Sequence, residues 1–210
     1  MTGAGSVGGK AADARPEDRV AFGAPGTVVC WHGSGDGPEI WEPLRRGLPE
    51  WDVLTPAAPN DLEFDHRPSI VAELLGDGFD GAAFLAGFSW GASLAARFAT
   101  RHPERVRGLV LVEGGHLDFA DVPDFDPPDD RDALVAEFGV DGARLWGLLA
   151  EPNKETWPAL QAASYPLLLV ASAMTESFAA AVPRAEIVPG HGHEIPYDVV
   201  AAWLDRSHRH

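Results

Sequence analysis

Residues 87–91 read Gly-Phe-Ser-Trp-Gly, and a serine in this setting can do nucleophilic chemistry. The apolar run Ala82–Ala86 precedes the segment and is typical of a buried strand, whereas Trp90–His102 has helical periodicity and stops at Pro103. A serine at a strand-to-helix turn takes a strained backbone conformation, and flanking glycines remove side chains that would collide with neighbouring elements. Backbone N–H groups at the start of a helix stabilise negative charge that develops beside the hydroxyl. The sequence therefore predicts a nucleophile elbow at Ser89.

This elbow and two further segments resemble the α/β-hydrolase family over about residues 27–204. In the first segment, an apolar run leads into His-Gly-Ser-Gly at residues 32–35. The resemblance implies that the backbone N–H groups of Ser34 and Trp90 form an oxyanion hole. We expect His32 to brace this loop rather than to take part in catalysis.

The second segment lies near the end of the chain, where a weak strand leads into Pro-Gly-His-Gly-His-Glu at residues 189–194 and then into a helix. In the family, the catalytic histidine lies in such a loop and usually follows a glycine. Both His191 and His193 follow a glycine, and His193 lies closer to the helix, so we expect His193 to be the general base. A His-x-His pair could also begin a metal site, but no third ligand stands at a recognisable spacing. We therefore predict neither a metal nor a cofactor.

In the family, a carboxylate completes a catalytic triad with the serine and the histidine. This acid is the point at which the chain departs from the family pattern. The family most often places an aspartate after the strand that is here Leu167–Ala171, and the nearest carboxylate at that place is Glu176. Some branches place the acid after the preceding strand, where this chain has Glu113. Glutamate can hold the tautomer of an imidazole and stabilise its cation as aspartate does. We expect Glu113 to be the acid and keep Glu176 as the alternative.

The elements that must position these residues form an alternating pattern of apolar runs and helix-like stretches from about residue 19. This alternation predicts an α/β fold with a doubly wound, mostly parallel sheet of six or seven strands. Strands are expected at Val20–Phe22, Thr27–Trp31, Asp52–Thr55, Ala82–Ala86, Val106–Val112, Leu167–Ala171 and Ala185–Val188. Helices are expected at Glu39–Gly47, Ser69–Leu75, Trp90–His102 and Tyr197–Arg206.

The domain organisation follows from composition. Residues 1–18 are rich in glycine and alanine without periodicity and are expected to be a disordered leader. Their pattern Gly-x-Gly-x-x-Gly follows no strand and so predicts no dinucleotide site. Residues 19–210 are expected to form a single domain, in which 117–164 are an inserted helical cap with eleven acidic and three basic residues. The acidic run 124–130 in this insertion lacks the glycine and glutamate of a calcium loop.

Composition excludes several classes of function. The 210 residues carry 32 Asp plus Glu against 16 Lys plus Arg, a formal net charge of −16, which disfavours nucleic-acid and membrane-surface partners. No apolar run approaches the ~20 residues of a membrane-spanning helix and no signal-peptide pattern is present, so a cytoplasmic location is expected. The single cysteine, Cys30, lies in an apolar run and is expected to be a buried hydrophobic residue.

These observations predict a serine hydrolase that forms an acyl-enzyme on Ser89. A serine at this position argues against the related epoxide-hydrolase and dehalogenase branches, which use aspartate there. A small cap suits a compact acyl group, so the expected substrate is a small ester or thioester. Two alternatives stay open: a lyase or cyclase step at the same site, and a binding module without catalysis. The oligomeric state is not predicted.

Overall fold

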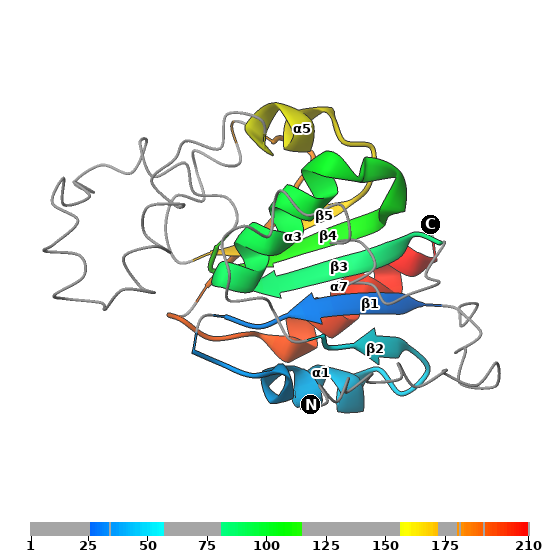
Figure 1. Cartoon of the computed structure of the whole chain (residues 1–210), viewed down its shortest axis with the longest axis vertical. Coiled ribbons are helices and arrows are strands. Elements are labelled where there is room, and N and C mark those ends of the chain that lie inside the picture. The colour runs from blue at the N-terminus through cyan, green and yellow to red at the C-terminus, as the bar shows by residue number, and fades with distance from the viewer. Residues whose placement is uncertain are drawn as a thin grey trace, which may run out of the picture.

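Six parallel strands form a single sheet in the part of the chain that the structure, a computed structural model, describes (Figure 1). The described residues are 26–33, 35–56, 81–114, 156–171, 180, 182–190 and 192–209. The strands are β1 (Thr27–Trp31), β2 (Asp52–Leu54), β3 (Ala83–Phe88), β4 (Val106–Val112), β5 (Leu167–Ala171) and β6 (Glu186–Pro189). Their spatial order is β2-β1-β3-β4-β5-β6, and every neighbouring pair is parallel. The predicted fold class is confirmed.

Helices cover both faces of this sheet. They are α1 (Glu42–Gly47), which a 3-10 helix at Pro38–Trp41 precedes, α3 (Trp90–Arg101), α5 (Thr156–Ala162) and α7 (Tyr197–His208). Figure 1 shows α3 in front of the sheet and α7 behind it. Leu94 and Phe98 of α3 belong to one apolar cluster, and Leu44 of α1 and Trp203 of α7 belong to the other. The sheet is therefore doubly wound, with a core on each face.

The central strands are apolar on both sides because each side meets one of these cores. In β1, Val28 and Cys30 belong to the cluster with α1 and α7, whereas Val29 and Trp31 belong to the cluster with α3. This alternation is the period-two geometry of a strand, and burial of both faces is characteristic of parallel sheets. Burial also raises the pKa of the Cys30 thiol above its ordinary range. The prediction that Cys30 is a buried residue of the core is confirmed.

The strand order fixes where a ligand can bind. After β1 the chain forms β2 on one side of β1, whereas β3 lies on the other side. Such a reversal opens a crevice at the carboxyl ends of the two strands, where open α/β sheets bind their ligands. His32 and Gly33 follow β1 and Ser89 follows β3, so these residues lie at the carboxyl ends of the two strands, where such a crevice is expected.

Element boundaries agree closely with the sequence predictions, with corrections at the ends. The strand expected to end at Ala86 continues to Phe88, and the last helix continues to His208. The helix expected from Glu39 begins instead as the 3-10 helix, because Pro38 and Pro43 interrupt regular helical hydrogen bonding there. The strand at 20–22, the helix at 69–75, the leader and most of the cap segment lie outside the described residues. No helix in the described ranges is long and apolar enough to cross a membrane.

Candidate active site

Ser89 lies at the junction of β3 and α3 and has a strained backbone. Its φ of 52° and ψ of −116° place it outside the regions that L-residues favour. Its N–H donates to the Val112 carbonyl oxygen at 2.8 Å, and its own carbonyl oxygen accepts from the Ala92 N–H at 3.0 Å. A strained conformation costs of order 1–3 kcal/mol and persists where the surroundings hold it. The predicted strand-to-helix turn at Ser89 is therefore present, and β4 and α3 hold it in place.

Three glycines around Ser89 allow the backbones to approach closely. A Cβ on Gly87 would lie 2.2 Å from the Gly91 carbonyl oxygen, and a Cβ on Gly91 would lie 2.2 Å from the Trp31 carbonyl oxygen. A Cβ on Gly114 would lie 2.3 Å from the carbonyl oxygen of Ser89 itself. These neighbours are backbone atoms, which cannot turn away as a side chain can. The packing of β1, β3, α3 and the residues after β4 therefore depends on the absence of side chains here.

The substitution Gly91→Ala tests this packing. We expect it to lower the free energy of unfolding by about 3 kcal/mol, because the added methyl group forces the backbones of α3 and β1 apart. For a domain of this size, the midpoint of thermal unfolding should fall by about 6–12 °C, as measured by circular dichroism. The matched control is Gly47→Ala at the end of α1, where a Cβ would lie 4.0 Å from the Ala201 Cβ, an ordinary contact. Equal midpoints for the two variants would contradict the packing argument.

The loop after β1 lies directly against Ser89. Trp31 pairs with Gly87 across the two strands, and a Cβ on Gly33 would lie 3.3 Å from the Ser89 Cβ. His32 is buried, and its Nδ1 lies 2.9 Å from the Gly33 carbonyl oxygen. This position within the fold agrees with a bracing role for His32. Ser34, the expected oxyanion-hole residue of this loop, lies outside the described residues.

Glu113 follows β4 and shares with Ser89 a positive φ. These two are the non-glycine residues with positive φ in the described part of the chain, and the φ of Glu113 is 49°. The Glu113 N–H donates to the Val170 carbonyl oxygen at 2.8 Å, and Gly114 packs against the Ser89 backbone. A left-handed conformation is uncommon for glutamate, and such strain clusters at functional sites. Glu113 therefore lies at the same edge of the sheet as Ser89, one strand away, whereas Glu176 lies outside the described residues.

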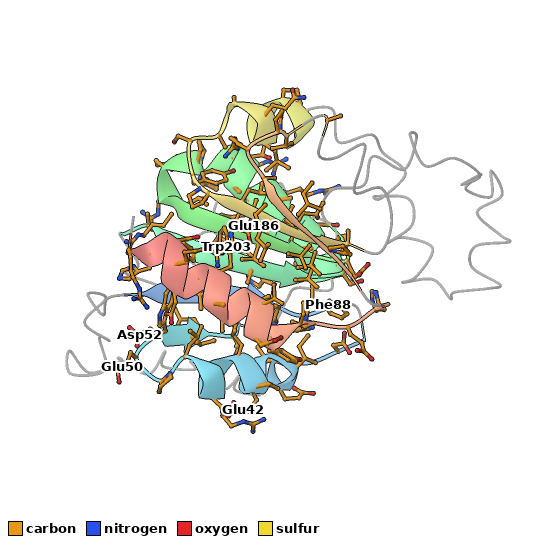
Figure 2. All side chains as sticks on the ribbon, turned by 180° about the vertical axis from the view of Figure 1, so that it is seen from behind. Glu42, Glu50, Asp52, Phe88, Glu186 and Trp203 are labelled. Atoms are coloured by element: carbon orange, nitrogen blue, oxygen red, sulfur yellow. The ribbon has the colours of Figure 1, made fainter. Side chains whose placement is uncertain are left out.

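His193 lies in the segment between β6 and α7, and this segment returns across the sheet edge to the end of β3. The imidazole of His193 contacts the ring of Phe88, with centroids 4.5 Å apart and planes inclined by 46°. Figure 2 shows Phe88 near the end of the sheet where this segment connects β6 to α7. His193 lies in a tight turn. Gly192 has a φ of 94°, and the Glu194 N–H donates to the Gly192 carbonyl oxygen, which closes the turn. His193 is thus placed beside the residue that precedes Ser89; His191 lies outside the described residues.

Together these contacts bring Ser89, Trp90, Glu113 and His193 to the carboxyl edge of the sheet. The other predicted site residues, Ser34, His191 and Glu176, lie outside the described part of the chain. Sequence reasoning missed the contact that Phe88 makes with His193 and the packing of Gly114 on Ser89. The glycine directly after Glu113 was a signal for the close packing of Gly114 on Ser89. No sequence pattern indicates the contact between Phe88 and His193. Among the described residues, no group of three or more His, Cys, Asp or Glu side chains could hold a metal ion.

Comparison with known proteins gives the same architecture. A sequence model of the family described as alpha/beta hydrolase fold matches residues 26–151. A pimeloyl-[acyl-carrier protein] methyl ester esterase of Aromatoleum aromaticum is 36% identical over 89 residues, which are 40% of this chain and 36% of the esterase. A 2-hydroxy-6-oxo-2,4-heptadienoate hydrolase of Pseudomonas putida is 36% identical over 104 residues, 43% of this chain and 38% of that hydrolase. This chain therefore aligns with less than half the length of either relative.

A solved structure of a thermophilic esterase from Thermogutta terrifontis superimposes with a TM-score of 0.61 at 19% sequence identity. The superposition covers 87% of this chain and 90% of the esterase. At this level of identity the likeness concerns the fold. It extends the similarity beyond the residues that the sequence comparisons align.

Proposed function

Because the chain belongs to the alpha/beta hydrolase fold family, we propose that it is a serine hydrolase that cleaves a small ester or thioester through an acyl-enzyme. The observation that carries this proposal is the strained backbone of Ser89, with a φ of 52° at the start of α3. This conformation has a free-energy cost, and β4, α3 and three glycines maintain it. A partly exposed nucleophile at a helix N-terminus accounts for the arrangement.

The proposed reaction has two balanced steps. In the first, the Ser89 hydroxyl oxygen bonds to the substrate carbonyl carbon while His193 takes the hydroxyl proton. The Trp90 and Ser34 N–H groups stabilise the resulting oxyanion, and His193 returns the proton to the leaving alcohol or thiol as its bond to carbon breaks. In the second step, water attacks the acyl-enzyme with His193 again as base, which releases the carboxylic acid and regenerates Ser89.

The names of the relatives support hydrolysis as the overall reaction. One relative is named as an esterase acting on a methyl ester, and the other is named as a hydrolase. An ester or thioester requires no chemistry beyond a nucleophile, a base and oxyanion stabilisation. The side chains gathered at the sheet edge can supply the first two of these, and the N-terminus of α3 can supply part of the third.

Labelling with a fluorophosphonate tests the proposed nucleophile. Such a reagent phosphonylates an activated serine with loss of fluoride, and an unactivated hydroxyl does not react at a comparable rate. We expect rapid labelling of the wild-type chain and none of Ser89→Ala, with the modified peptide located by mass spectrometry. Unlabelled wild-type protein would overturn the proposal, and labelling at any other residue would place the nucleophile elsewhere.

The proposed role of Glu113 gives a further prediction. Glu113→Gln keeps the size of the side chain and removes its charge, so the imidazole of His193 loses the group that aligns it and stabilises its cation. Loss of the comparable carboxylate in a known triad lowers kcat by ~10⁴-fold, and we expect a loss of the order of 10²–10⁴ here, measured with an activated ester. Glu176→Gln should retain kcat within about threefold. The reverse pattern would assign the acid to Glu176.

A further inference from the structure

Asp36 brings a carboxylate close to Ser89 that the proposed triad does not use. A Cβ placed on Gly33 would lie 2.7 Å from the Asp36 Oδ2 and 3.3 Å from the Ser89 Cβ. These two distances share one end, so the carboxylate oxygen and the Ser89 Cβ are no further apart than the sum of 2.7 Å and 3.3 Å. The space between the two groups is open because residue 33 is a glycine. A side chain at this position would occupy that space.

The loop itself holds Asp36 at this place. The Asp36 N–H donates to the Gly33 carbonyl oxygen at 3.3 Å, which closes a turn at the end of β1. Asp36 is exposed to solvent, and in the part of the chain that the structure describes no arginine or histidine forms an ion pair with it. By contrast, the exposed carboxylates of Glu42 and Glu186 pair with Arg45 and Arg206, each at 2.8 Å.

The charge of Asp36 also affects Tyr197, the first residue of α7. Burial raises the pKa of the Tyr197 hydroxyl above its ordinary value, and the negative charge of Asp36 adds to this increase. Tyr197 begins α7, and its hydroxyl donates to the Ile40 carbonyl oxygen. The carboxylate therefore lies near both Ser89 and Tyr197 at the start of α7, close to the atom that the proposed reaction uses.

From this geometry we propose that Asp36 is a specificity-determining residue that selects substrates by charge. It favours esters and thioesters that carry a positive charge within a few bonds of the reacting carbonyl, and it disfavours those that carry a negative charge there. This inference rests on the proposed function, because it requires that the substrate carbonyl binds beside the Ser89 hydroxyl. At such separations near a protein surface, one unit charge changes the interaction by about three- to tenfold in rate or binding.

Three thioacetates of nearly the same shape test the proposal. Their thiol parts end in a trimethylammonium group (acetylthiocholine), a neutral tert-butyl group and a sulfonate group, and thiol release gives kcat/KM for each. The wild-type chain should prefer the cation to the anion, and Asp36→Asn should lower that ratio by about tenfold or more. Asp36→Lys should invert it. The measurements are made at low ionic strength, because salt screens an exposed charge.

The matched control is Glu50→Gln. It removes the same unit charge from an exposed side chain near the amino end of β2, and Figure 2 shows Glu50 at the opposite edge from Phe88. We expect its cation-to-anion ratio to stay within twofold of the wild-type ratio, because solvent and salt screen a charge that lies far from Ser89. An equal fall of the ratio in Glu50→Gln and Asp36→Asn would overturn the proposal.

The failure of this inference can be distinguished from failure of the proposed function. Wild-type cleavage of the neutral thioacetate with an unchanged charge ratio in both Asp36 variants would overturn the role of Asp36 alone. Absence of thiol release together with absence of fluorophosphonate labelling would overturn both. If labelling occurs without thioacetate turnover, the cation-to-anion ratio is measured on the labelling rates of a cationic and an anionic organophosphorus ester, with the same expected effect of Asp36→Asn.

Discussion

Replacement of Ser89 by alanine should abolish turnover of small activated esters. The substitution removes the atom that forms the acyl-enzyme, so we expect kcat to fall by about 10³-fold or more. The backbone of residue 89 is held by hydrogen bonds to Val112 and Ala92, which alanine also makes, so the fold should be kept. Steady-state kinetics and a circular dichroism spectrum of the same sample measure the two effects together.

The matched control for this variant is Ser93→Ala, one turn further along α3. The Ser93 N–H donates to the Ser89 carbonyl oxygen through the backbone, so alanine at residue 93 removes only a hydroxyl group. Its kcat should stay within about threefold of the wild-type value. Activity of Ser89→Ala within tenfold of the wild-type value would remove Ser89 from the nucleophile's role.

His193→Ala should lose kcat to a similar extent, because without a base the serine hydroxyl is a weak nucleophile at neutral pH. Residues that act as a unit are not additive, so the double variant Ser89→Ala/His193→Ala should be little slower than either single variant. His191→Ala is the comparison, and we expect a small effect from it. If His191→Ala were the inactive variant and His193→Ala remained active, the general base would be His191.

Much of the sheet follows from local sequence, as three strands show. Thr27–Trp31, Val106–Val112 and Leu167–Ala171 have the same bounds in the structure as in the prediction. Each is a mostly apolar run, interrupted by Arg107 in Val106–Val112, and is bounded by polar residues, glycine or proline, so its length is visible without tertiary information. β3 was predicted to end two residues too early, because Gly87 and Phe88 were assigned to the turn, whereas both pair with β4.

The site could be predicted only in part, for a different reason. The position of Ser89 follows from a strand, a turn and a helix that are contiguous in the chain. The contact of His193 with Phe88 and the approach of Asp36 to Ser89 join segments that only the folded sheet brings together. The choice between Glu113 and Glu176 stayed open for the same reason, since both follow strands of the correct kind. A positive φ at Glu113 is a property that no local pattern indicates.

The elbow constrains its backbone far more than its side chain, and this matters for redesign of the protein. Gly87, Gly91 and Gly114 are fixed by contacts with main-chain atoms, whereas the Ser89 side chain enters none of those contacts. Under the proposed function, the reacting side chain can therefore be changed while the backbone that holds it is kept. Cysteine at residue 89 would present a thiolate in the place of the hydroxyl, and aspartate a carboxylate, without any change in how the strands and α3 fit together. A mutational library at residue 89 would then sample different side-chain chemistries on one scaffold, whereas a library at any of the three glycines would mainly yield variants of lower stability.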